Sequence, residues 1–489
     1  MKGMFSPTRE AFLGQRGSGG PVPLVATLLA DMETPLSAYW KLAHDDPYSF
    51  LLESVTGGEA LARYSMIGCR PKHVVSGTGK SLTLDGVTRD LDSKEDLMEE
   101  VLKLIPRLGP EEAAGLPRLC GGAVGWIAYD YVRSIEKLPL DTVDDLNLPD
   151  VGFMVLDQAV VFDHARNVIQ VIVLAEPTDE GYTSAKSRIE EMVAVLKGPL
   201  PELPTSPGTS PTFVSNVQPD DYKASVEKCV KYIFAGDAFQ IVPSQRQEAE
   251  CTAHPLLVYR ALRSLNPSPY MFLFRMDGTD IVGASPEILV ALTGRNALVR
   301  PIAGTRPRGS SIEEDNEVAA DLLKDEKERA EHIMLVDLGR NDLGRVCQYG
   351  SIKVKDLMVV EHYSHVMHIV SEVEGTLRPD VTPIDLIRAT FPAGTLTGAP
   401  KVRAMEIIEE LEPTRRGLYG GAVGFISATG DMDLAIAIRS ALIRNGKCYV
   451  QAGAGVVYDS NPEKEHQECL NKAMAVVRAV IQAHEGLPG

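Results

Sequence analysis

The chain has 489 residues, of which 44% are hydrophobic and 24% charged, and its formal net charge is −18 at pH 7. This length is expected to form two domains or one large composite domain, and the composition is that of an ordinary globular protein. The excess of negative charge argues against nucleic acid or an anionic membrane as the main partner.

The cysteines and the lack of long apolar segments indicate in which compartment the protein is found. The seven cysteines are scattered and include no Cys-x-x-Cys pair, which fits a reducing environment. No long apolar run follows a basic start, and no stretch of about 18 uninterrupted apolar residues occurs. These features predict a cytoplasmic protein with no membrane partner.

A proline-rich segment divides the chain. Residues 1–20 carry glycine and serine and are expected to be loosely ordered. Residues 21–198 form the predicted N-terminal domain. Five prolines between positions 199 and 211 exclude a helix or a central strand, so residues 199–218 are predicted to be a linker or a long surface loop. Residues 219–489 form the larger predicted domain.

Strand-like alternation runs through both parts of the chain. Residues 155–174 predict a hairpin with its turn near 164–167. Helical spacing is predicted in the second part at 255–264, 313–336, 383–390, 401–411 and 462–484. We therefore expect an α+β fold of large antiparallel or mixed sheets, sandwich-like and covered by helices. No Gly-x-Gly-x-x-Gly links a strand to a helix, which disfavours a Rossmann fold.

One short motif occurs twice. Gly-Gly-Ala-Val-Gly followed by an aromatic residue and isoleucine spans 121–127 and recurs at 420–426. Such a short repeat does not prove duplication, but it indicates related glycine-rich strands in the two halves.

Two predicted helices carry carboxylates at helical spacing. The acidic residues that share a helix face are Asp325, Glu328 and Glu331 in one helix, and Glu465 and Glu468 in the other. The second helix has a typical start, with Asn461 as N-cap and Pro462 at the first helical position. Oxygen ligands without cysteine favour Mg²⁺. A solvated surface would explain either helix alone, so the prediction depends on their pairing.

Three further segments could hold an anion. Gly453 and Gly455 would let backbone N–H groups approach a ligand closely. Arg439 is a charge among apolar strand residues, and a substrate carboxylate would pair with it. The loop 301–308 offers Thr305 and two arginines, although these could simply balance an acidic surface. The spacing predicts a Mg²⁺-dependent enzyme acting on a small dicarboxylate.

Three histidines at 362, 365 and 368 suggest zinc at first sight. In a strand, His362 and His368 face one side while His365 faces the other, so the three cannot form one ligand face. One of them acting as a general base is the favoured interpretation.

Four segments together resemble the chorismate-utilising enzymes. They are Pro301 to Pro307, Glu331 to Asp342, Phe391 to Lys401, and His466 to Leu470. The resemblance covers at least 219–480 and is greatest to the large subunits of anthranilate synthases. It implies conversion of chorismate and ammonia to anthranilate and pyruvate, the first committed step of tryptophan biosynthesis, with Mg²⁺ as cofactor.

The resemblance also implies a role for individual residues. Glu331 and Glu468 would hold Mg²⁺, Glu287 would be the general acid on the departing ring hydroxyl, and His368 would assist pyruvate elimination. Thr395 would line the site, and Gln240 could orient ammonia without generating hydroxide. The residues expected to bind the two substrate carboxylates are Gly304, Thr305, Tyr419, Arg439, Gly453, Ala454 and Gly455.

Regulation and a partner follow from the same resemblance. Ser54, in Leu-Leu-Glu-Ser, and the segment Pro269, Tyr270 and Met271 resemble the family's inhibition site for L-tryptophan. The N-terminal domain would thus be a smaller regulatory portion. No Cys-His-Glu amidotransferase segment is present, so ammonia would come from a separate glutamine amidotransferase subunit in a hetero-oligomer, a heterotetramer.

Three alternatives remain. Aminodeoxychorismate synthases typically carry lysine where this chain has Ala303, and isochorismate or salicylate synthases usually carry lysine in place of Gln240. A catalytically inactive tryptophan-sensing subunit would not need Glu287 or His368. Pro243 departs from the aliphatic residue usual in relatives.

Overall fold

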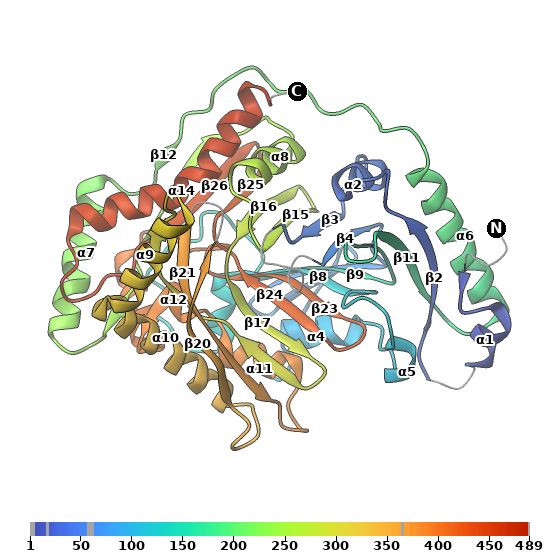
Figure 1. Ribbon diagram of the computed structural model, residues 1–489, viewed down its shortest axis with the longest axis horizontal. Coiled ribbons are helices and arrows are strands. Elements are labelled where there is room, and N and C mark those ends of the chain that lie inside the picture. Colours follow the sequence, from blue (N-terminus) through green and yellow to red (C-terminus); the bar gives the residue numbers. More distant parts are fainter. Residues whose placement is uncertain (1–4, 16–18, 56–62, 363–365, 488–489) are drawn as a thin grey trace.

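Two large β-sheets pack face to face between helices in the computed structural model (Figure 1), which describes residues 5–15, 19–55, 63–362 and 366–487. Every pairing between neighbouring strands in these ranges is antiparallel. The predicted α+β fold of helix-covered sheets is confirmed.

The first sheet combines strands from both halves of the chain. In spatial order its strands are β1 (Phe5–Ser6), β2 (Val22–Leu29), β11 (Val168–Ala175), β10 (Gln158–Asp163), β4 (Tyr64–Cys69), β3 (Ser49–Glu53), β15 (Tyr270–Met276), β16 (Thr279–Ser285), β25 (Ser440–Arg444), β26 (Lys447–Gly453), β14 (Ser244–Glu250) and β12 (Val214–Ser215). The predicted hairpin is formed by β10 and β11.

The second sheet is built in the same way. Its strands run in the order β19 (Ile302–Pro307), β21 (Val366–Thr376), β18 (Asn296–Val299), β17 (Ile288–Thr293), β24 (Met432–Ile436), β23 (Ala422–Ser427), β8 (Gly122–Ile127), β9 (Val151–Leu156), β5 (His73–Thr78), β6 (Ser81–Leu84) and β7 (Val87–Asp90). Strand β20 (Lys353–His362) also pairs with β21, and a separate two-stranded piece joins β13 (Gln240–Ile241) to β22 (Gly398–Ala399).

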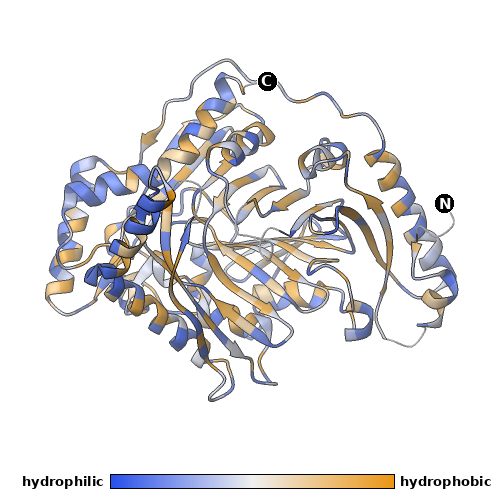
Figure 2. Ribbon diagram, in the orientation of Figure 1, coloured by the Kyte–Doolittle hydropathy of each residue, from blue (hydrophilic) through white to orange (hydrophobic). Residues whose placement is uncertain are grey.

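Helices cover the outer face of each sheet. Those on the first sheet are α1 (Arg9–Gly14), α2 (Pro35–Ala43), α6 (Asp179–Leu196), α7 (Pro219–Phe234), α8 (Pro255–Leu265) and α14 (Pro462–Glu485). The remaining helices are α4 (Leu97–Leu104), α5 (Pro110–Ala113), α9 (Ile312–Lys324), α10 (Glu326–Gly344), α11 (Pro383–Thr390), α12 (Gly394–Thr397) and α13 (Lys401–Leu411). Helix α13 contributes Ile407 and Ile408 to the core of the first group. Figure 2 shows apolar residues along both sheets and polar residues on the outward sides of the helices.

The sheets continue across the predicted domain boundary. Strand β3 pairs with β15, and β8 pairs with β23, so each sheet joins residues on both sides of 199–218. The core between the sheets likewise contains Trp126 from the first half and Phe272 from the second. This favours the composite alternative over two domains with separate cores, because neither half closes its sheets alone.

The two glycine-rich repeats meet in space. Gly125 of β8 lies opposite Gly424 of β23 at the centre of the second sheet. A Cβ at Gly125 would lie 1.9 Å from the Gly152 carbonyl oxygen, so close backbone packing excludes a side chain there. The repeat thus marks adjacent central strands.

Two local expectations need correction, and a third agrees with the structure. The stretch 5–15 is folded rather than loose, because β1 pairs with β2 and Phe12 of α1 is buried. The single helix expected over 313–336 is two helices, since Asp325 takes an extended conformation and caps α10 by accepting the N–H groups of Lys327 and Glu328. Residues 199–213 do form a long connection without helix or strand, which arches from α6 to β12 (Figure 1).

Candidate active site

Glu287 is a buried carboxyl group at the start of β17. Thr395 Oγ1, on α12, donates a hydrogen bond of 3.0 Å to its Oε1. Burial raises the pKa of Glu287 to about 8, although the hydrogen bond from Thr395 and the charges of Arg439 and Lys472 oppose the shift. Glu287 is therefore protonated at neutral pH and able to donate a proton.

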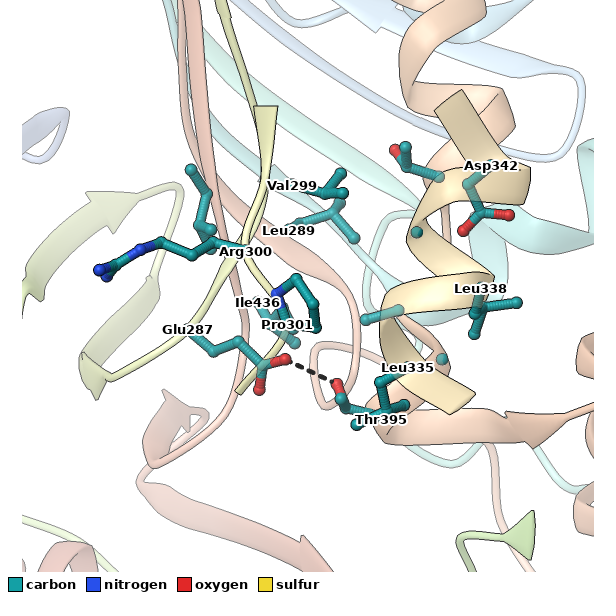
Figure 3. A pocket seen from close by; sticks show the side chains of 15 residues that line it. Glu287, Leu289, Val299, Arg300, Pro301, Leu335, Leu338, Asp342, Thr395 and Ile436 are labelled. Atoms are coloured by element: carbon teal, nitrogen blue, oxygen red, sulfur yellow. Dashed lines mark hydrogen bonds between the residues drawn. The ribbon is translucent and has the colours of Figure 1, made fainter. Parts of the chain in front are cut away.

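A cavity of about 50 Å³ adjoins this acid (Figure 3). Glu287 and Thr395 lie at one end, and Leu335 and Leu338 of α10 lie beside Thr395. The largely apolar wall is the physical reason for the raised pKa, since it replaces water that would solvate a carboxylate.

His368 provides a neutral imidazole on β21. Burial lowers its pKa to about 4. Its Nδ1 lies 3.2 Å from the carbonyl oxygen of Gly304 and 3.0 Å from Thr305 Oγ1. A carbonyl only accepts, so Nδ1 carries the proton and Nε2 carries the basic lone pair. Gly304 makes this contact from a left-handed conformation (φ 68°) at a bulge in β19, where other residues would be strained.

Two helices bring carboxylates together. Glu331 of α10 is half-buried, and its pKa is raised by burial and further by the negative charges of Glu328 and Glu468. On α14, Glu468 forms an ion pair of 2.8 Å with Lys472, whose Nζ also donates to the Gly453 carbonyl oxygen at 3.2 Å. Lys472 thus balances part of the negative charge of Glu331 and Glu468. Arg306 does the same for Glu328 through an ion pair of 2.9 Å.

Carboxylate oxygens are ligands that a hard divalent cation prefers. The part of the chain that the structure describes holds no group of three or more His, Cys, Asp and Glu side chains suited to a metal ion. Glu331 and Glu468 lie close enough for the charge of Glu468 to raise the pKa of Glu331. Mg²⁺ in proteins is usually held by one or two carboxylates, and water and substrate complete its coordination shell. These two residues could supply such carboxylates.

Gln240 connects the two sides of the site. Its Nε2 donates a hydrogen bond of 2.9 Å to Glu331 Oε1, while its Oε1 is buried and meets no partner among the described residues. A Cβ at Gly455 would lie 2.6 Å from Gln240 Nε2, so only glycine lets the amide occupy this place. The unsatisfied oxygen is suited to accept an N–H from a ligand.

The sequence of this chain matches those of known proteins. The sequence model of the family described as chorismate binding enzyme matches residues 39–478. The chain belongs to this family. The resemblance drawn from the four sequence segments is confirmed.

Curated relatives extend the match to nearly the whole chain. Anthranilate synthase component 1 from Pseudomonas aeruginosa is 47% identical over 98% of this chain and 99% of its own length. The protein of that name from Mycobacterium bovis is 47% identical over 97% of this chain and 96% of its own length.

Two solved structures share the fold. Anthranilate synthase component I from Streptococcus pneumoniae aligns with a TM-score of 0.79 and 38% identity, over 92% of this chain and 99% of its own. The menaquinone-specific isochorismate synthase from Escherichia coli aligns with a TM-score of 0.72 at 18% identity, over 97% and 99%, which is a likeness of fold alone.

Two of the residues expected to bind the substrate carboxylates lie near groups already described. Arg439 lies between β24 and β25 in a left-handed conformation (φ 49°), not within a strand, and its charge lowers the pKa of both Glu287 and His368. Tyr419 is buried, and a Cβ at Gly453 would lie 2.9 Å from its hydroxyl.

One backbone donor is used inside the protein. The N–H of Ala454 donates to the carbonyl oxygen of Pro243 at 3.3 Å, which also accepts from the Tyr222 hydroxyl at 3.2 Å. The expected role of the Ala454 amide toward a ligand is therefore not supported. Pro243 also separates β13 from β14, because proline has no N–H to continue the ladder.

The expected inhibitor-binding segments lie side by side. Met271 pairs with Glu53 across β15 and β3, and the N–H of Val55 donates to the Ser268 carbonyl oxygen at 3.2 Å. Ser54, Pro269 and Tyr270 belong to these adjoining segments. Sheet pairing thus unites residues from the two halves of the chain.

Sequence reasoning missed two charged residues of the site regions. Lys472 follows Glu468 by four residues on one helix, and this spacing could have revealed the pair. Glu53 is buried at the end of β3 and accepts hydrogen bonds from the Tyr259 hydroxyl and from Arg263 Nε. No sequence pattern links these residues, because they lie on separate elements.

The structure adds no support for a zinc site at His362, His365 and His368. His362 is exposed on β20, opposite Met367 of β21. His365 lies outside the described residues.

Proposed function

We propose that this protein is the chorismate-converting component of an anthranilate synthase, forming anthranilate and pyruvate from chorismate and ammonia. The observation that carries the proposal is a protonated carboxylic acid, Glu287, and a neutral imidazole, His368, around one arginine, Arg439. The full-length relatives named anthranilate synthase component 1 support the same assignment.

The chemistry needs an acid first and a base second. Hydroxide is a poor leaving group, so Glu287 protonates the ring hydroxyl as ammonia forms the new C–N bond, and water leaves. The nitrogen then loses its extra proton. His368, whose Nε2 carries the lone pair, takes the proton from the ring carbon that bears the new amine. The bond between the ring and the enolpyruvyl oxygen breaks, the ring becomes aromatic, and the departing enolate takes up a proton on its methylene carbon to become pyruvate.

Binding and orientation fall to the residues around this pair. Arg439 and Tyr419 would hold one substrate carboxylate, with Gly304, Thr305 and the amides of Gly453 and Gly455 completing the pocket. Mg²⁺, held by Glu331 and Glu468, would supply positive charge against the ring carboxylate. Gln240 would use its buried Oε1 to orient ammonia.

A direct assay tests the proposal. The purified chain, given chorismate, ammonia and Mg²⁺, is expected to produce anthranilate, followed by its fluorescence. Formation of a 4-amino product or of isochorismate instead would favour the alternatives, which Ala303 and Gln240 argue against. An inert chain that binds tryptophan would indicate a sensing subunit.

A separate glutamine amidotransferase subunit is proposed as the ammonia source, in a hetero-oligomer such as a heterotetramer. The designation component 1 in the relatives agrees with a second component. The cytoplasm is the proposed compartment, since all seven cysteines are free and buried. Among the described residues, no helix is long and apolar enough to cross a membrane.

We expect L-tryptophan to raise the apparent KM for chorismate, and Ser54→Ala to weaken that effect. Ser54 directly follows β3, which pairs with the strand that carries Met271, so an inhibitor touching both residues would bias how the two halves meet. By linkage, chorismate must weaken tryptophan binding by the same factor by which tryptophan weakens chorismate binding. Steady-state kinetics measures the apparent KM, and calorimetry measures the binding of tryptophan and of chorismate. Ser76→Ala, on β5 of the other sheet, serves as control. Absence of tryptophan binding to the parent protein would contradict this regulation.

We expect Gln240→Lys to depress anthranilate formation and to allow some isochorismate to form. A lysine with a lowered pKa can remove a proton from water, whereas an amide cannot. Product analysis by chromatography across a pH series measures the outcome.

Gln240→Leu is the matched control for this change, because it removes the hydrogen bond to Glu331 without adding a base. It should lose amination and yield no isochorismate. If Gln240→Lys aminates chorismate as well as the parent at every pH, position 240 does not select the nucleophile.

A further inference from the structure

His332 is a polar residue in the core stripe of α10. The buried residues of this helix are His332, Leu335, Val336 and Leu343, which lie at helical spacing, and His332 is 0% exposed. Its neighbour Glu331 is turned toward Gln240 instead. A leucine at position 332 would pack in this apolar row without removing a polar group from water. Burying the imidazole therefore costs desolvation free energy, which packing alone does not explain.

A single short contact compensates the buried ring. His332 Nε2 lies 2.6 Å from Ser371 Oγ on β21, whereas His332 Nδ1 is buried and meets no hydrogen-bond partner in the part of the chain that the structure describes. Burial also lowers the pKa of His332 to about 4, so the ring is neutral. The contact with Ser371 is thus the specific interaction of this side chain.

Ser371 is itself a junction of several elements. Its Oγ accepts the N–H of Met358 at 2.9 Å, where β20 has an irregular register and Met358 is left-handed (φ 58°). The N–H of Ser371 donates to the carbonyl oxygen of Pro301 at 3.2 Å, just before β19 begins. One serine therefore joins α10, β20, β21 and the entry to β19.

The same strands carry the proposed chemistry. His368 precedes Ser371 by three residues on β21, about 10 Å along a strand, and Thr305 of β19 pairs with His368. Glu331 directly precedes His332 on α10. Apolar side chains alone tolerate small rotations of a helix over a sheet, whereas a buried polar contact specifies one register.

We propose that His332 is a positioning residue whose bond to Ser371 fixes the helix carrying Glu331 against the strands carrying His368 and Thr305. The inference rests on the proposed function of Glu331 as a metal ligand. His332 touches no reacting atom and acts through this register.

The test compares His332→Leu, Ser371→Ala and the double variant. Mg²⁺ binding to the protein without substrate is measured by calorimetry, and backbone hydrogen exchange of 326–344 and 366–376 by mass spectrometry. We expect Mg²⁺ affinity to fall about tenfold in each single variant, with faster exchange in both segments. The double variant should bind Mg²⁺ no more weakly than the single variant with the lower affinity, because the two single substitutions remove the same interaction.

Two variants separate register from general packing. His332→Gln, whose side-chain amide can bond to Ser371, should recover part of the lost Mg²⁺ affinity. His164→Leu is a control for the loss of a His–Ser hydrogen bond, since the exposed His164, just after β10, has its Nε2 2.8 Å from Ser65 Oγ and should change neither measurement. If His332→Leu fails to fold, Ser371→Ala, which is a smaller change, still tests whether the contact positions α10.

The outcomes distinguish the inference from the function on which it rests. Unchanged exchange and Mg²⁺ affinity in Ser371→Ala and His332→Leu, with Mg²⁺ binding lost in Glu331→Ala, would overturn the positioning role and leave the metal site standing. Normal Mg²⁺ binding by Glu331→Ala would overturn the metal site, and hydrogen exchange would then decide the positioning role by itself.

Discussion

Glu331→Ala and Glu468→Ala are each expected to lower turnover by about two to four orders of magnitude while the protein stays folded. Glu331 is half-buried and Glu468 is exposed, and both raise the negative potential of the site, so removing one relieves repulsion rather than opening the core. Turnover as a function of Mg²⁺ concentration and the unfolding temperature are the measurements.

Glu326→Ala is the control on the same helix, because Glu326 is exposed in the first turn of α10. It should leave the Mg²⁺ dependence as in the parent. Near-normal Mg²⁺ dependence in both Glu331→Ala and Glu468→Ala would remove the metal assignment.

Glu287→Gln is expected to reduce turnover by about two to four orders of magnitude, because a neutral amide occupies the same space but cannot protonate a leaving hydroxyl. The pKa of Glu287 is raised to about 8, so the parent loses kcat/KM as pH rises through about 8 and the acid ionises. Rates are compared at constant un-ionised ammonia. The variant should lack this alkaline limb.

Thr395→Val tests the origin of that limb. The Thr395 hydrogen bond lowers the pKa of Glu287, so its loss should move the limb to higher pH. A limb that persists unchanged in Glu287→Gln would show that another group controls it.

The same pKa makes a stability prediction. Because the folded-state pKa is raised, ionising Glu287 destabilises the folded protein, and stability is lost as pH rises from about 4.5 through about 8. Glu287→Gln has no charge to bury, so its unfolding temperature should exceed that of the parent increasingly over this range.

Local elements and the family could be predicted from the sequence. Asn461 and Pro462 begin α14 as expected, because capping depends on neighbouring residues alone. The segments at 301–307, 331–342, 391–401 and 466–470 were enough to indicate chorismate binding enzymes, since each is a contiguous motif. Alternation and turn residues likewise predicted antiparallel sheets under helices.

Contacts between distant residues and the protonation states of buried groups depend on the packing of the whole fold. Gln240 reaches Glu331, ninety-one residues away, because β13 is held between β22 and the segment after Gly455. The pKa of Glu287 depends on walls from distant elements, and no local pattern encodes burial. The break at Asp325 and the sheets shared across 199–218 were also missed, because strand register and helix breaks are settled by packing partners far apart in sequence.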